Sequence, residues 1–232
     1  MNTVTHFYST EILAIAAANY FVKLSEEAIA TKGKFTVALS GGSTPAALFT
    51  LLATEEYATK INWKNVYVFW GDERCVALDS EENNTYNAKN ILLNNVPIPK
   101  KNIFVIPVNE TPINAAIYYE ATLKISFKTD MPKFDLVLLG LGEDGHTASL
   151  FPHTTILQEK NKLVKEVFLA EKNIWRVSLT EPIINNAAHK LFLVSGKNKA
   201  AMLDIILNGE KNTEKYPAQM IKNAEWFVSV GE

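Results

Sequence analysis

Short apolar runs alternate along this chain with longer segments in which apolar residues recur at helical spacing. Several of the short runs are continuously apolar, which is typical of parallel strands that are covered on both faces. The pattern therefore predicts an α/β fold with a largely parallel sheet and helices on both faces. The expected strands are 35–39, 66–70, 103–106, 134–139, 163–168, 175–179, 191–194 and 226–230, and the expected helices are 10–30, 45–53, 86–93, 112–127 and 197–207.

No linker, low-complexity run or internal repeat interrupts this alternation, so the sequence predicts a single domain over residues 1–232. In sheets of this kind the binding sites lie at the carboxyl ends of the strands. We therefore expect the chemistry in the loops that follow the strands. Thr44 and Pro45 predict the N-cap and the first residue of the second helix.

The loop after strand 35–39 has the composition of a phosphate site. Ser40, Gly41, Gly42, Ser43 and Thr44 follow the strand and lead into a helix. Glycines allow a ligand close to the backbone, hydroxyls add donors, and a helix N-terminus adds free N–H groups and a partial positive charge. The loop lacks the Gly-Lys-Ser/Thr of a nucleoside triphosphate loop. A simple strand-to-helix turn is the alternative interpretation.

An acidic loop follows strand 66–70, where Asp72 and Glu73 precede Arg74. Only two of the 23 basic residues are arginines, Arg74 and Arg176, and both lie in or beside predicted strands. The planar fork of arginine suits two-pronged binding of phosphate or carboxylate, for which lysine is no substitute. The two arginines indicate anion binding, and a structural ion pair with the acids is the alternative.

The segment 140–145 matches the G-x-G-x-x-G pattern of dinucleotide-binding loops, but its context does not fit. Glu143 and Asp144 would repel a pyrophosphate, and Pro152 limits the helix that should follow. His146 is more informative, because Asp144 beside it can orient the imidazole and raise its basicity. This pair predicts a general base, with a purely structural histidine as the alternative.

Composition narrows the class of protein. The 232 residues are 47% hydrophobic and carry a net charge of −2, which is typical of a globular protein and disfavours nucleic-acid binding. The single cysteine, Cys75, excludes an internal disulfide. No apolar run is long enough to span a membrane, and segment 12–22 lacks the preceding basic residues of a signal peptide, so we expect a cytoplasmic protein.

Several catalytic motifs are absent. The chain has no G-x-S-x-G elbow and no zinc-ligand spacing such as H-E-x-x-H, and Cys75 has no adjacent histidine. We interpret Cys75 as a small buried hydrophobe. A phosphate site and a His/Asp pair, with no expected metal or cofactor, indicate hydrolysis or proton transfer on a phosphorylated small molecule.

Six segments resemble, in the same order, motifs of the glucosamine-6-phosphate isomerase/6-phosphogluconolactonase family in its lactonase form. The most specific is Gly-Leu-Gly-Glu-Asp-Gly-His-Thr-Ala-Ser-Leu-Phe-Pro at 140–152. The resemblance covers nearly the whole chain, from about residue 10 to 230. The other segments are 39–45, 70–74, 176–180, 195–200 and 216–218.

This resemblance implies a Rossmann-like fold and a metal-independent hydrolase of the oxidative pentose phosphate pathway, a carboxylic ester hydrolase acting on 6-phospho-D-glucono-1,5-lactone. It implies His146 as the general base, with Asp144 and Asp72 as supporting acids. The expected partner is this small sugar phosphate lactone, without nucleic acid or membrane, and the chain would be a monomer or a small homo-oligomer. The implied substrate and phosphate contacts are Ser40, Gly41, Gly42, Ser43, Thr44, Arg74, Arg176 and Lys199.

One segment departs from the family pattern, and two other functions compete. Asn-Asn-Thr-Tyr at 83–86 stands where the family tends to have Ser-Asn-Tyr, so we expect no substrate contact there. A glucosamine-6-phosphate deaminase or isomerase would carry a glutamate before Pro152, and this chain has Phe151. A non-catalytic sugar-phosphate sensor would need the phosphate loop without the His/Asp pair.

Overall fold

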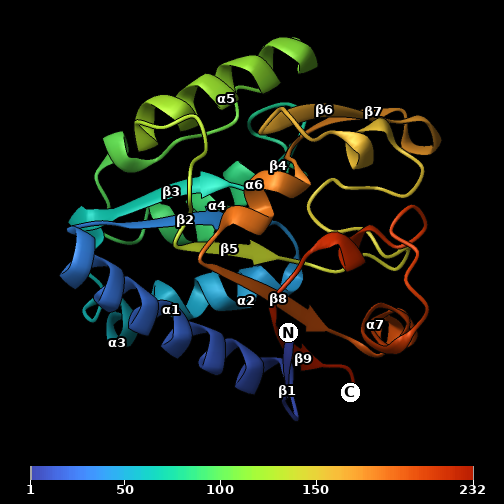
Figure 1. Cartoon of the computed structure of the whole chain (residues 1–232). Helices are drawn as coiled ribbons and strands as arrows, with labels where there is room; N and C mark the ends of the chain where they lie inside the picture. The colour runs from blue at the N-terminus through green and yellow to red at the C-terminus, as the bar shows by residue number, and fades with distance from the viewer. Residues whose placement is uncertain (1, 232) are drawn as a thin grey trace.

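A six-stranded parallel sheet forms the centre of the computed structural model, which describes residues 2–231 (Figure 1). Every neighbouring pair in this sheet is parallel. The predicted α/β fold with a largely parallel sheet is confirmed. In spatial order the strands are β1 (Thr3–His6), β9 (Glu225–Ser229), β8 (His189–Ser195), β5 (Leu136–Leu139), β2 (Phe35–Leu39) and β3 (Val66–Trp70).

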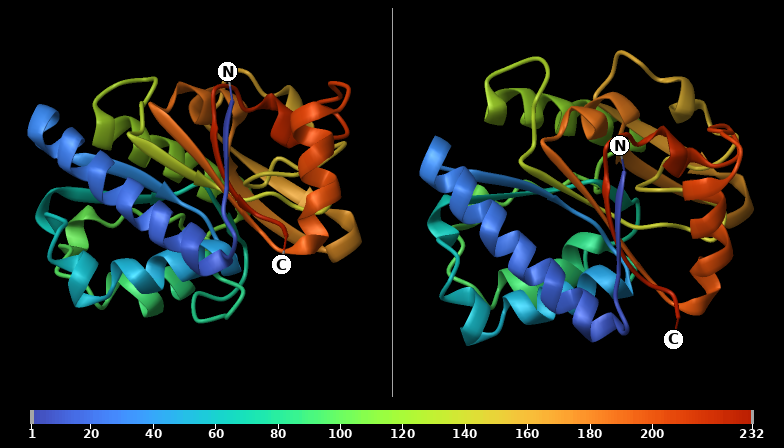
Figure 2. Two further views of the ribbon diagram at one scale, coloured as in Figure 1. Left: turned by 90° about the horizontal axis from the view of Figure 1, so that it is seen from below. Right: turned by 60° about the horizontal axis from the view of Figure 1, so that its bottom comes forward.

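The middle of the sheet holds the core. Every residue of β2 and of β5 is buried, as their continuously apolar sequences require. β2 pairs with β3 from Phe35 opposite Val66 to Leu39 opposite Trp70, so the two strands end together. At one edge, β1 lies beside β9, which brings the first and last strands of the chain together (Figure 2).

Helices cover both faces of the sheet (Figure 1). α1 and α2 pack against each other on one face, and α5 lies on the opposite side against a second, smaller sheet. The helices are α1 (Thr10–Lys32), α2 (Ser43–Leu52), α3 (Glu55–Ala58), α4 (Asn84–Ala88), α5 (Pro112–Phe127), α6 (Glu181–Asn186) and α7 (Ala200–Asn208).

The second sheet is antiparallel and corrects the prediction for two strands. β4 (Asp72–Arg74), β7 (Ile174–Leu179) and β6 (Val164–Leu169) form it in that order. The runs 163–168 and 175–179 were expected in the parallel sheet. They are joined by a short turn that ends at Asn173 in the left-handed region. A connection of this length permits only an antiparallel pair, because a parallel pair needs a long crossover.

The predicted start of the second helix is wrong. α2 begins at Ser43, and Gly42 with φ 110° is its N-cap, so Thr44 lies inside the first turn. Gly42 can adopt this positive φ because it has no Cβ, and the chain enters the helix earlier than Thr44 and Pro45 indicate. The Oγ1 of Thr44 instead forms a hydrogen bond of 2.7 Å with the Oγ of Ser195.

Two further expectations differ from the structure. The run 103–106 is not a strand, because Ile103 forms only an isolated bridge with Val68 of β3. Pro107, which has no N–H to donate, follows the run directly. The helix expected over 86–93 starts at Asn84, where Asn83 caps it, and continues into a π-helical turn over Lys89–Leu93.

Candidate active site

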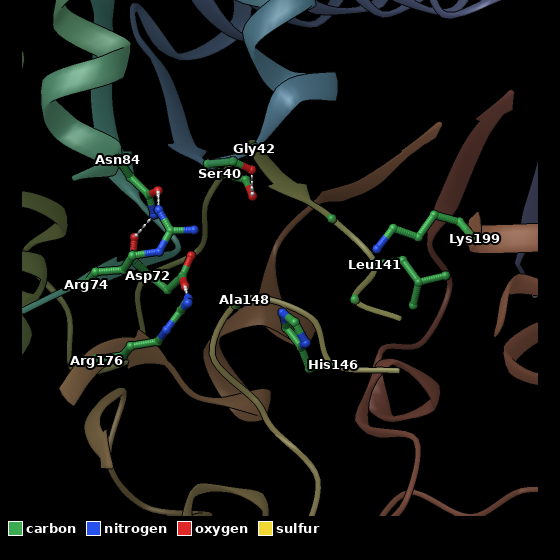
Figure 3. A pocket seen from close by; sticks show the side chains of 13 residues that line it. Ser40, Gly42, Asp72, Arg74, Asn84, Leu141, His146, Ala148, Arg176 and Lys199 are labelled. Carbon is green, nitrogen blue, oxygen red and sulfur yellow. Dashed lines mark hydrogen bonds and ion pairs between the residues drawn. The ribbon is translucent and has the colours of Figure 1, made fainter. Parts of the chain in front are cut away.

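A cavity of about 280 Å³ opens where the carboxyl ends of β2, β3 and β5 meet the small antiparallel sheet (Figure 3). A second cavity of about 180 Å³ adjoins it over the start of α2. The two cavities share five lining residues: Gly41, Gly42, Gly140, Leu141 and Lys199. The first cavity is lined by Ser40, Gly41, Gly42, Asp72, Arg74, Asn84, Gly140, Leu141, Gly142, His146, Ala148, Arg176 and Lys199.

The loop between β2 and α2 presents a helix N-terminus to both cavities. No side chain caps α2, so the N–H groups of Ser43 and Thr44 in its first turn have no intrahelical acceptor. Gly41 is required here, because a Cβ would lie 2.0 Å from the Oδ1 of Asn84. These features provide backbone donors and a partial positive charge, which suit an anionic ligand.

Lys199 adds a full positive charge on the side of the cavity that lies across from Arg74 and Arg176 (Figure 3). It ends the short turn Lys197–Lys199 that leads from β8 into α7. Its Nζ forms a long ion pair with the Oε1 of Glu143 at 3.8 Å, too long for a hydrogen bond. The ammonium group is therefore available to a ligand.

Two arginines lie on the β4 and β7 side of the cavity. The Nη1 of Arg74 donates to the backbone oxygen of Glu82 at 2.5 Å and to the Oδ1 of Asn84 at 3.1 Å. Arg176 is 8% exposed, and its Nε has no hydrogen-bond partner among the described residues. A buried guanidinium with an unused donor is suited to an anionic partner.

The charge balance around Arg176 has a clear physical origin. Burial lowers the pKa of the guanidinium, the carboxylate of Asp72 raises it, and the neighbouring charge of Arg74 lowers it further, with a net decrease. The Nη1 of Arg176 lies 3.4 Å from the Oδ2 of Asp72, which is a long contact. Asp72 is held more firmly by Ser149, whose Oγ donates to the same oxygen at 2.6 Å.

His146 and Asp144 form the pair expected from the sequence. The Nδ1 of His146 lies 2.5 Å from the Oδ1 of Asp144, and the His146 backbone N–H donates to the same oxygen at 3.1 Å. Burial raises the pKa of Asp144, but the hydrogen bonds and charge of His146 outweigh it and the pKa falls below its usual value. Asp144 therefore stays ionised, and Nε2 of the imidazole remains free for water or substrate.

A glycine gives the imidazole its space. A Cβ on Gly142 would lie 2.1 Å from the Nδ1 of His146 and 2.5 Å from the Oδ1 of Asp144. The N–H of Gly142 also donates to the His146 backbone oxygen at 2.8 Å. The glycine-rich segment 140–145 thus leaves space for the imidazole of His146 and forms a turn around it.

The structure brings the predicted site residues together. Asp144 lines neither cavity and reaches the site through His146. Asn84 borders the cavity, although no substrate contact was expected in the segment 83–86. The one feature of the sequence that could have indicated this is its position directly after Asn83, which caps α4. Leu141 and Ala148 were not predicted either. The other predicted residues line one or both cavities: Ser40, Gly41, Gly42, Ser43, Thr44, Asp72, Arg74, His146, Arg176 and Lys199.

Residues 2–231, the part of the chain that the structure describes, contain neither a cluster of metal-binding side chains nor a membrane-spanning helix. No group of three or more histidine, cysteine, aspartate or glutamate side chains is gathered as a metal ion requires. No helix in the same part of the chain is long and apolar enough to cross a membrane.

Comparison with known proteins gives consistent results. The family described as "Glucosamine-6-phosphate isomerases/6-phosphogluconolactonase" matches residues 8–228. A 6-phosphogluconolactonase of Nostoc sp. is 39% identical over 201 residues, which cover 85% of this chain and 81% of the relative.

Two solved structures share the fold. The 6-phosphogluconolactonase of Thermotoga maritima superposes with a TM-score of 0.84 at 29% identity, covering 98% of this chain and 99% of that one. A monomeric glucosamine-6-phosphate deaminase reaches a TM-score of 0.83 at 19% identity, covering 97% of this chain and 96% of that one, and this shows the fold alone. The chain belongs to the glucosamine-6-phosphate isomerase/6-phosphogluconolactonase family.

Proposed function

We propose that this chain hydrolyses 6-phospho-D-glucono-1,5-lactone to 6-phosphogluconate, with His146 as the general base on water and without a metal ion. The prediction of a 6-phosphogluconolactonase-type enzyme is confirmed by the identity to relatives of that name. The observation that carries the mechanism is the His146–Asp144 pair, whose histidine borders a cavity with cationic groups on its other sides (Figure 3).

The reaction needs little from the protein, because a δ-lactone is an activated ester. Nε2 of His146 takes a proton from water as the oxygen attacks C1, and Asp144 stabilises the imidazolium that forms. The tetrahedral intermediate then collapses, and the ring oxygen leaves with a proton returned by His146. Backbone N–H groups of the glycine-rich segment 140–145 would stabilise the developing oxyanion, apart from those of Gly142 and Gly145, which donate within the loop.

The phosphate of the substrate is proposed to bind remote from C1. The start of α2, from Ser40 to Thr44, supplies N–H groups and hydroxyls, and Arg74, Arg176 and Lys199 supply charge. The unpaired buried Nε of Arg176 supports this role most directly. Such contacts fix the orientation of the ring and thereby assist the chemistry.

The two competing functions have less support. A deaminase or isomerase must return a proton to a sugar ring oxygen, and Phe151, which stands before Pro152, has no proton to give. A sensor would need no base, yet the cavity contains an imidazole held by an ionised carboxylate. The cellular compartment and the oligomeric state of the chain stay predictions. We expect a cytoplasmic protein that is a monomer or a small homo-oligomer.

The test is a turnover assay with freshly prepared 6-phosphogluconolactone, corrected for spontaneous hydrolysis, beside glucosamine 6-phosphate under the same conditions. We expect rapid turnover of the lactone and none of the amino sugar. Turnover of the amino sugar alone would favour the deaminase. Tight binding of the lactone without turnover would favour the sensor.

A further inference from the structure

Phe151 lies against two groups on which the proposed mechanism depends, the base His146 and the cation Arg176. Its ring stacks on the imidazole of His146, with 4.0 Å between ring centroids and 25° between planes. The guanidinium carbon of Arg176 lies 5.2 Å from the centroid of the same ring. Phe151 is 6% exposed and is not among the residues that line the cavity at His146. One buried ring thus links the base to an anion-binding arginine without facing the substrate.

The local backbone explains how the ring reaches the histidine. Thr147 and Leu150 close a tight turn in which the N–H of Leu150 donates to the oxygen of Thr147 at 2.9 Å. Ala148 within this turn has φ 48°, a conformation that non-glycine residues rarely adopt. The turn folds the chain back on itself, and the Oγ1 of Thr154 donates to the backbone oxygen of Phe151 at 2.6 Å. The strained turn places the ring against His146.

The polar contacts of His146 and Arg176 do not fix either side chain completely. Asp144 holds the edge of the imidazole at Nδ1, which leaves the ring free to rock about that point, and a flat surface against its face removes this freedom. Among the described residues, the only side-chain hydrogen bond of Arg176 is the 3.4 Å contact of its Nη1 with Asp72, and its Nε is unpaired. The aromatic face restrains the plane of the imidazole and the position of the guanidinium together.

The chemistry of the ring suits this place. The face of an aromatic ring attracts cations, so it stabilises Arg176 and the imidazolium that forms when His146 accepts a proton. The second attraction grows as the transition state develops, and only such an interaction speeds the chemical step. A carboxylate at the same position would pair with both cations and draw them from the substrate. Phenylalanine attracts both without offering a competing hydrogen bond.

We propose that Phe151 is a positioning residue that holds His146 and Arg176 in their working orientations. The proposal rests on the proposed function. Loss of the ring face should have two separate effects. It should lower kcat through His146, and it should weaken the binding of a phosphorylated ligand through Arg176.

The experiment compares Phe151→Leu, which keeps apolar bulk without a flat face, with Phe151→Tyr, which keeps the face. A cavity of about 460 Å³, separate from the one at His146, borders Phe151 and Asp144. We expect Phe151→Leu to lose roughly 10- to 100-fold in kcat, the usual effect of a misplaced catalytic group. Its affinity for 6-phosphogluconate, measured by calorimetry, should also fall. Phe151→Tyr should restore both.

Phe21→Leu is the matched control. Phe21 is a buried phenylalanine of α1 that packs edge-on against Phe35, outside both active-site cavities. Its loss should lower the melting temperature and leave kcat and product affinity unchanged. If Phe151→Leu is unfolded at the assay temperature, Phe151→Met replaces it. A folded variant without the ring face that keeps its kcat or its product affinity overturns the proposal, and so does a Phe21→Leu variant with the same losses.

His146→Asn, assayed beside these variants, separates this proposal from the function on which it rests. If His146→Asn keeps its kcat, the general-base role itself fails. If His146→Asn loses activity and folded Phe151→Leu does not, only the positioning role of Phe151 fails.

Discussion

Arg74 and Arg176 stand directly opposite each other on the antiparallel strands β4 and β7. Opposite residues of a ladder point to the same face, and like charges there destabilise a sheet. The two neighbouring acids, Asp72 and Glu73, are both buried. These two residues are the only arginines in the chain, and they occupy a place unfavourable to the fold. We propose that they are kept there to bind an anionic ligand.

The first prediction concerns the fork of Arg176. Arg176→Lys keeps the charge but loses two-pronged donation, which should cost about 1.5–3 kcal/mol, or roughly 10- to 150-fold in kcat/KM. Activity on unphosphorylated gluconolactone, where measurable, should barely change, because that substrate has no phosphate to lose. Steady-state kinetics on the two lactones makes the comparison. Equal losses on both would assign Arg176 to the reacting ring or to folding instead.

The second prediction concerns the space around the imidazole. Gly142→Ala places a Cβ 2.1 Å from the Nδ1 of His146, so the ring or the loop must move. We expect kcat to fall roughly 100-fold, since a shift of about 1 Å at a catalytic group has this effect. Gly71→Ala is the control, because its Cβ would meet only the Leu39 backbone oxygen at an ordinary 3.5 Å. Normal kcat in Gly142→Ala would show that the imidazole position matters little.

The third prediction concerns Cys75. Burial and the charge of Glu73 raise the pKa of its thiol to about 11, against a smaller lowering by Arg176. Because the thiolate is the reactive form, roughly one thiol in three thousand is ionised at pH 7.5. Iodoacetamide should therefore modify Cys75 far more slowly than glutathione at pH 7.5, with a rate that rises up to about pH 11. Cys75 is partly buried rather than fully buried as expected from the sequence. Rapid labelling at neutral pH would contradict its interpretation as an inert thiol.

The fourth prediction concerns metal ions. The site offers one histidine and two carboxylates already paired with other side chains, Asp72 with Ser149 and Asp144 with His146. Prolonged treatment with EDTA should leave lactonase activity unchanged. The metal-free mechanism is wrong if activity disappears and one divalent metal restores it.

Sequence pattern predicted the elements whose signals are local. β2, β3 and α5 start and end where expected, because their apolar runs are continuous or their caps are clear, as with Thr111 before Pro112. β1 and β4 escaped notice for the opposite reason. Thr3–His6 is polar and mostly exposed, and Asp72–Arg74 is entirely charged, so each forms a strand only through its partner strand.

The site divides in the same way. Residues whose chemistry is visible in a motif, such as His146 with Asp144, were predicted and lie together. Asn84 contacts residues that are distant in sequence, and Phe151 contacts a histidine against which a turn folds it back. The Oδ1 of Asn84 accepts a hydrogen bond from Arg74 and lies where a Cβ on Gly41 would be. The ring of Phe151 stacks on His146. No periodicity or spacing reports such contacts, because they depend on the tertiary fold.

The central claim is that His146 activates water. His146→Asn retains a polar side chain of similar reach but cannot accept the proton, so kcat for 6-phosphogluconolactone should fall roughly 10²–10⁴-fold, with a smaller change in KM. The measurement is kcat of the folded variant with fresh lactone, corrected for spontaneous hydrolysis. A folded His146→Asn protein with near-normal kcat would contradict the account.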